Sequence, residues 1–189
     1  MGRVSDTASH PTIDQLDAGL GHLYGSPLDH GSVELVLRRP GLGEREILDA
    51  AELRVGAGVV GDNYLERGST ATPDGSAHPE AQLNIMNSRA IDLVAAGDRA
   101  RWPLAGDQLF VDLDVSVDNL PVGTRLRVGT AVIEVAAKPH TGCAKFRDRF
   151  GVDAARWVNQ SREQRRRGLC AMVVADGIVR PGDAITKLP

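Results

Sequence analysis

The residues best suited to chemistry lie in one short stretch, KPHTGCAKFRDRFG, which runs from Lys138 to Gly151. It contains Cys143, one of only two cysteines in the chain. Four basic residues and one acid, Asp148, give the stretch a net charge of +3, although the whole chain carries −3. The basic residues are Lys138, Lys145, Arg147 and Arg149. Such surroundings favour the thiolate form of a cysteine, which binds soft metals and attacks sulfur.

The local pattern also predicts a helix start beside the thiol. The preceding strand is expected to end before Pro139, which opposes a helix running back into it. Thr141 is placed to cap a short helical segment over residues 142–150, which Gly151 would close. Cys143 would then lie in the first turn, where free backbone N–H groups stabilise an anion.

A second interpretation of each cysteine is that it is inert. Cysteine is among the most buried residue types, so spacing alone does not decide whether Cys143 is reactive or packed. Cys170 lies inside the apolar run GLCAMVV with no charge beside it. We therefore predict that Cys170 belongs to the core.

Three further features could belong to the same site. His140 could bind zinc together with Cys143, but the sequence offers no second pair of zinc ligands. It could instead act as a base toward Cys143 or hydrogen-bond a cofactor. We favour the interpretation that it is a histidine of the turn beside Pro139. Asp62 follows a glycine-rich bend and could orient a ligand or simply be a turn carboxylate. Arg165–Arg167 are interpreted as a solvated helix end, with a phosphate clamp beside the thiol as the alternative.

The elements that must position these residues are mostly strands. Alternating apolar residues predict strands over residues 32–40, 107–116 and 124–137, with shorter ones within 44–55 and 81–87, and a hairpin over 169–188. Helices are expected over 12–24, 88–97 with Ser88 as N-cap, and 153–167 with Asp153 as N-cap and Gly168 as stop. About seven short strands without a βαβ rhythm predict a mainly β, barrel-like fold with a few short inserted helices. We expect an N-terminal arm that could hold a short helix over residues 1–31, and the barrel domain over 32–189.

Length and composition narrow the class of protein further. The chain has 189 residues, 42% of them apolar, and a net charge of −3, so nothing favours nucleic acid or an anionic membrane surface. It has no apolar run near the ~20 residues of a membrane span and no apolar signal-peptide core at its start. Two cysteines do not form a disulfide framework. These features predict a cytoplasmic protein with reduced thiols.

The stretch around the thiol also carries a family resemblance. PHTGCAKFRDRFG, preceded by GTRLRVGTAVIEV and by DLDVSVDNLP, resembles the signature region of MOSC domains. The family takes its name from the C-terminal domain of molybdenum cofactor sulfurases. A weaker likeness extends over residues 32–188 and includes VVGD and VRPGDAI.

The resemblance implies a β-barrel-like fold in which Cys143 is the functional and catalytic cysteine. In the family this cysteine is proposed either to ligate molybdenum in a pterin cofactor or to carry sulfur, and some members reduce N-hydroxylated compounds. The resemblance therefore implies molybdenum cofactor binding, a small-molecule substrate and an oxidoreductase activity. The cofactor-binding residues expected beside Cys143 are Lys138, His140, Thr141, Lys145, Arg147, Arg149 and Asp62.

Two alternatives stay open at this stage. Cys143 could carry a persulfide as a sulfur carrier, or the basic stretch could be a non-catalytic module that binds an anionic ligand. Asn63-Tyr64 and Gly106-Asp107-Gln108 stand where many relatives have residues that hold the cofactor, and this keeps the module alternative open. The chain has neither a pyridoxal-phosphate desulfurase domain nor an iron–sulfur cysteine set, so we expect a separate redox partner or cysteine desulfurase.

Overall fold

Seven strands close into a mixed barrel in the computed structural model, which describes residues 10–189. Around the barrel the order is β1 (Gly31–Arg38), β6 (Leu109–Asp112), β5 (Leu83–Asn87), β9 (Leu169–Ala175), β8 (Ala131–Val135), β7 (Arg125–Val128) and β11 (Ala184–Lys187). β11 pairs with β1 and completes the closure, and β5 and β6 are the parallel neighbours. The predicted fold class is confirmed.

The barrel forms because its strands alternate apolar and polar residues. In β8 every second residue is buried, and its partner β7 shows the same period. The inward side chains form one apolar cluster, which includes Val33, Leu109, Ile133 and Ile185. β1 carries an irregular register between Val33 and Leu35, so both of its faces contribute buried residues.

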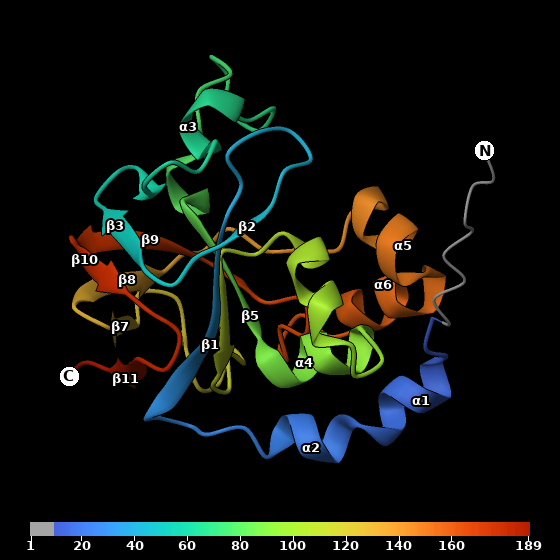
Figure 1. The fold of residues 1–189 in the computed structure, drawn as a ribbon. Coiled ribbons are helices and arrows are strands. Elements are labelled where there is room, and N and C mark those ends of the chain that lie inside the picture. Colours follow the sequence, from blue (N-terminus) through green and yellow to red (C-terminus); the bar gives the residue numbers. More distant parts are fainter. Residues whose placement is uncertain (1–9) are drawn as a thin grey trace.

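Four shorter strands lie outside the barrel. β2 (Glu46–Ile47) pairs antiparallel with the end of β1. A separate three-stranded sheet consists of β3 (Ala51–Arg54), β4 (Gly58–Val59) and β10 (Gly177–Val179). The segment between this sheet and the barrel contains α3 (Tyr64–Arg67) and the 3₁₀ turn η1 (Pro79–Ala81). Figure 1 shows the small sheet on the left and α3 at the top of the molecule.

The remaining helices gather on the other side of the barrel (Figure 1). They are α1 (Ile13–Ala18), α2 (Leu20–Tyr24), α4 (Ser88–Val94), η2 (Arg99–Ala105), α5 (Ala144–Phe150) and α6 (Val152–Asn159). Their apolar faces enclose a second cluster that contains Leu16, Phe110 and Trp157. The N-terminal arm takes part in this packing, since Trp157 Nε1 donates a hydrogen bond to Asp17 at 3.0 Å. Residues 1–9 of the predicted arm lie outside the described residues.

Several predicted helix ends were wrong. The segment 12–24 is two helices separated at Gly19, although Thr12 does cap the first with a complete capping box. Asn87, not Ser88, accepts the capping hydrogen bonds of α4. The helix predicted over 153–167 begins one residue earlier and stops at Asn159.

The strand predictions also need correction. Segment 169–188 is no hairpin, because β9 pairs with β8 and β5, β10 with β3, and β11 with β7 and β1. Segment 44–55 supplies two short strands in different sheets, and 124–137 folds back on itself as the β7–β8 hairpin. Within residues 10–189 no helix is both long and apolar enough to span a membrane.

Candidate functional site

Cys143 is the last residue of the connection between β8 and α5, residues 136–143, and it is exposed. We call the final six residues of this connection, 138–143, the thiol loop. Cys143 itself is the N-cap of α5, so the prediction that Thr141 caps this helix was wrong. Asn159 of α6 holds the loop in place: its side chain accepts a hydrogen bond from the Gly142 N–H at 2.9 Å and donates one to the Gly142 carbonyl at 3.1 Å.

A cavity of about 210 Å³, here the thiol cavity, opens beside Cys143. Its walls carry six basic side chains, and its described lining residues include no Asp or Glu. The basic residues are Arg39, Arg45, Arg67, Lys145, Arg149 and Arg167. They come from the β1–β2 loop, α3, α5 and the segment before β9. The fold therefore concentrates positive charge around the thiol from four separate parts of the chain.

Arg39 is held in the cavity wall by Asp62. The Asp62 carboxylate is fully buried; it accepts hydrogen bonds from Arg39 Nη2 at 2.9 Å and from Arg39 Nε at 3.0 Å. It also accepts the Arg39 backbone N–H at 2.8 Å. Asp62, predicted as a cofactor-binding residue, thus lies behind Arg39, and its effect on a ligand would pass through that guanidinium.

Arg45 and Arg67 have no such carboxylate partner among residues 10–189. Burial, together with repulsion from Arg149 and Arg39, lowers the pKa of Arg45. Burial and the nearby Arg39 likewise lower the pKa of Arg67. Arg45 Nε is buried without a hydrogen-bond partner, as is Asn63 Oδ1 in the same wall. An anionic ligand would satisfy the Arg45 Nε donor and compensate the two cations, whereas Asn63 Oδ1 is an acceptor and needs a donor group.

Three side chains, Asp107, Arg167 and His140, form a largely buried hydrogen-bonded network that holds the thiol loop through His140. Asp107 has a fully buried side chain and accepts two hydrogen bonds from Arg167 Nη1, at 2.7 and 2.9 Å. It also contacts His140 Nε2 at 2.6 Å. Arg167 completes its contacts by donating to the Ala105 carbonyl at 3.1 Å and by stacking over the ring of Phe146 at 4.8 Å.

This network fixes the protonation of its members. Burial alone would raise the pKa of Asp107, but Arg167 and His140 outweigh it and hold the pKa below its usual range. Burial and repulsion from Arg167 lower the pKa of His140 despite the attraction of Asp107. Asp107 is therefore ionised and His140 neutral near pH 7, so His140 Nε2 carries the hydrogen that Asp107 accepts. His140 Nδ1 is left as an acceptor; it has no partner among the described residues and is not sealed from solvent.

The structure brings together only part of the predicted site. Lys145, Arg149, His140 and Thr141 line the thiol cavity with Cys143. Lys138 lies farther along the loop and lines two neighbouring cavities instead. Arg147 points to the exposed side of α5, where it pairs with Asp148, and lines none of the described cavities around the loop.

Two interpretations of basic residues need correction. Arg167 is not part of a solvated helix end: its side chain is only 7% exposed and lies within the site. His140 is more than a turn histidine, since its side chain is 11% exposed and paired with Asp107. Neither partner could be recognised from spacing, because Asp107 lies 33 and 60 residues away along the chain.

The positions that depart from the family pattern have roles in this fold. Asp107 anchors His140 and Arg167, and Gln108 accepts the Asn84 backbone N–H at 2.8 Å. Tyr64 is buried and donates to the His78 carbonyl at 2.7 Å. Three arginines from other positions, Arg39, Arg45 and Arg67, line the thiol cavity. Sequence reasoning missed these three arginines, which precede the signature stretch and have no local motif.

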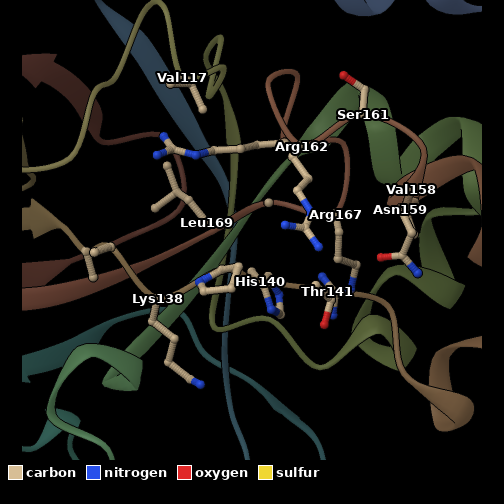
Figure 2. A pocket seen from close by; sticks show the side chains of 15 residues that line it. Val117, Lys138, His140, Thr141, Val158, Asn159, Ser161, Arg162, Arg167 and Leu169 are labelled. Atoms are coloured by element: carbon tan, nitrogen blue, oxygen red, sulfur yellow. The ribbon is translucent and has the colours of Figure 1, made fainter.

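Two further cavities adjoin the thiol loop, with volumes of about 360 and 240 Å³. Figure 2 shows the larger one, with Lys138, His140 and Thr141 along its lower edge. Cys170 borders the smaller cavity but is buried, as predicted, and burial raises its pKa to about 11.

Across the described residues, no three His, Cys, Asp or Glu side chains are grouped as a metal site.

These observations define a class: a closed mixed β-barrel that presents one exposed thiol in a cation-lined cavity. The MOSC domain model matches residues 72–186, more than half of the chain. The chain belongs to the MOSC domain family.

No curated protein matches the sequence significantly. Several solved structures share the fold at low sequence identity. YuaD from Bacillus subtilis aligns with a TM-score of 0.58 and 16% identity, covering 82% of this chain and 93% of that one. YiiM from Escherichia coli aligns with a TM-score of 0.55 and 18% identity, covering 84% and 70%. YiiM from Geobacillus stearothermophilus aligns with a TM-score of 0.52 and 11% identity, covering 87% and 75%.

Proposed function

We propose that this protein binds a molybdenum–pterin cofactor, with the Cys143 thiolate as the protein ligand of the metal, and reduces small N-oxygenated compounds. The observation that supports this most strongly is the excess of positive charge around one exposed thiol. A thiolate is the donor that soft metal centres prefer, and the cations match an anionic cofactor.

The side chains of the thiol cavity suit such a group. The pterin cofactor supplies its own sulfur ligands, so its metal needs few protein ligands besides the Cys143 thiolate, and His140 is the one other His, Cys, Asp or Glu among the described lining residues of the thiol cavity. Its phosphate and oxo groups would be held by Arg45, Arg67 and Lys145, none of which has a carboxylate partner in the described structure. When bound, the molybdenum would exchange electrons with the substrate.

The chain's own residues would orient the ligand and handle protons. Asp62 and Asp107 hold Arg39 and Arg167 rigidly, so these two guanidinium groups are fixed before a ligand arrives. Nδ1 of the neutral His140 is the available acceptor for a proton at this site. Removing oxygen from an N-hydroxylated compound consumes two electrons and two protons and releases water. The electrons would come from a separate redox protein.

Metal and pterin analysis tests the proposal directly. The protein is purified from cells that make the cofactor, beside the Cys143→Ser variant and the Arg147→Gln control, whose side chain lies outside the cavity. We expect about one molybdenum and one pterin per wild-type or control chain, and a strong loss in the serine variant. Wild-type protein without molybdenum or pterin would overturn the proposal.

A sulfur carrier is the second candidate, favoured by the exposure of Cys143. Its thiolate would attack the outer sulfur of a desulfurase persulfide, take up that sulfur and release the donor thiolate, with no net oxidation. Mass spectrometry after incubation with a cysteine desulfurase should show one added sulfur on the wild type and none on Cys143→Ser. No adduct on the wild type would remove this candidate.

The third candidate is a non-catalytic module that binds an anionic ligand. It predicts that Cys143→Ser leaves anion affinity unchanged, whereas Arg45→Gln with Lys145→Gln lowers the affinity and its salt dependence. A cofactor lost in Cys143→Ser would count against it.

A further inference from the structure

The 360 Å³ cavity on the other side of the thiol loop has its own basic lining. It lies between the loop and residues 158–169, and Cys143 does not border it. Figure 2 shows Val117, Arg162 and Ser161 along its upper edge, opposite Lys138 and His140. Four basic residues line it, and no Asp or Glu does so among its described lining residues. They are Lys138, Arg162, Arg165 and Arg167.

Three of these positive charges have no carboxylate partner. No carboxylate of residues 10–189 lies within 4.0 Å of Lys138, Arg162 or Arg165. Arg165 Nη1 is held only by the carbonyl groups of Leu120, at 2.6 Å, and Val115, at 3.4 Å. Burial lowers the pKa of Arg165, which means that this environment destabilises the charged form of its guanidinium group. An anion in the cavity would relieve that cost.

The backbone explains why these arginines face one cavity. In the turn that follows α6, the backbone takes a positive φ of 44° at Arg165 and of 107° at Gly168. Arg166 is directed away from the cavity and stacks over Trp157 at 4.8 Å. The residues on either side of it, Arg165 and Arg167, both line the cavity. Arg167 Nε is buried there without a hydrogen-bond partner.

The other walls of the cavity are apolar or neutral. Val117, Val158 and Leu169 supply apolar surface, and Asn159 and Ser161 supply neutral polar groups. The volume lies within the ~300–1,000 Å³ typical of small-molecule sites. A ligand that suits these walls combines a small apolar body with a group of high negative charge.

We propose that this cavity is a second binding site, for a small phosphate monoester with an apolar or aromatic body. The phosphate would lie between Arg162, Arg165 and Lys138, and the apolar body against Val117 and Leu169. The inference does not rest on the proposed function, because no residue that carries it is Cys143. The two cavities share His140, Thr141 and Arg167, but only the thiol cavity is bordered by Cys143.

The test measures binding of phenyl phosphate to the full chain by calorimetry, with inorganic phosphate and phenol as probes of each half of the ligand. We expect phenyl phosphate to bind more tightly than either. Loss of a charge-assisted hydrogen bond should lower affinity by about tenfold in Arg162→Gln and further in Arg162→Gln with Lys138→Gln. Arg162 is exposed, so circular dichroism should show that the variant folds normally.

Two controls separate this cavity from the rest of the surface. Arg147→Gln removes an exposed arginine that borders none of the described cavities, and Arg45→Gln removes a cation of the thiol cavity only. Both should leave phenyl phosphate affinity unchanged. An equal loss in Arg147→Gln, a loss in Arg45→Gln but not Arg162→Gln, or no binding at millimolar ligand would each overturn the proposal. None of these outcomes bears on the molybdenum content, so the two proposals fail separately.

Discussion

Replacing Asp107 by asparagine should destabilise the protein more than any change at an exposed carboxylate. The substitution keeps the size and one oxygen of the side chain, so His140 Nε2 can still donate a hydrogen bond. It removes the charge that faces Arg167, whose side chain is only 7% exposed. The Asn amide N–H₂ would also meet guanidinium donors that it cannot accept from.

The size of the effect follows from the burial of both partners. Breaking a buried ion pair from one side costs about 3–5 kcal/mol, because the remaining charge stays buried without compensation. In a chain of this length each kcal/mol lowers the melting temperature by about 2–4 °C. We therefore expect Asp107→Asn to melt about 6–20 °C below the wild type, with a corresponding loss in the denaturant midpoint.

A double-mutant cycle separates this cause from general disruption. Arg167→Met removes the buried cation and keeps apolar contact with Phe146, so Asp107→Asn combined with Arg167→Met should regain most of the lost free energy of unfolding. Asp148→Asn serves as control, since that carboxylate is 64% exposed and its loss should cost under ~0.5 kcal/mol. A loss below about 1 kcal/mol in Asp107→Asn, or strictly additive losses in the cycle, would refute the reasoning.

Three further predictions concern pH, thiol reactivity and backbone strain. Folding lowers the pKa of His140, so as the pH drops the unfolded chain takes up the His140 proton before the folded chain does. The free energy of unfolding should therefore fall below pH ~6.5. Urea denaturation at a series of pH values should show a smaller fall for His140→Gln, and an equal fall would contradict the assignment. An aromatic disulfide reagent should modify Cys143 in the native protein but Cys170 only after unfolding, because Cys170 is buried with a pKa of about 11; native Cys143→Ser that still reacts would count against this. Gly168→Ala should cost at least ~2 kcal/mol, because φ is 107° and the new Cβ would lie 2.1 Å from the Ile85 carbonyl oxygen. Gly182→Ala, with a φ of 88° and open space around it, should cost clearly less in the same thermal melts, and equal costs would show that the contact is unimportant.

The barrel could be predicted from the sequence because its signal is local. Strands such as β7 and β8 alternate apolar and polar residues, and that period survives in the folded structure. Pairing could not be predicted in the same way. The segment 169–188 has turn residues that suit a hairpin, yet its three strands find partners elsewhere, since the closure of the barrel is decided by long-range contacts.

The candidate site was predictable only where it is contiguous. The short helix α5 carries Lys145 and Arg149, and Cys143 is its N-cap, so the proximity of these three residues follows from the sequence. Arg39 and Arg45 approach the thiol only because β1 and its loop end at the thiol cavity. The helix predicted up to Arg167 ends at Asn159, and the turn after it brings Arg167 to Asp107, a partner 60 residues earlier that no local pattern reveals.

The placement of acids explains how a chain of net charge −3 makes two positive cavities. The carboxylates of Asp62 and Asp107 are both fully buried, and each is bound to one arginine that it orients. They neutralise Arg39 and Arg167 but leave Arg45 and Arg162 uncompensated on either side of the loop. Unpaired cations reduce the stability of the folded chain, and a bound anion raises that stability with the logarithm of its concentration relative to Kd. We therefore expect both cavities to prefer negatively charged ligands.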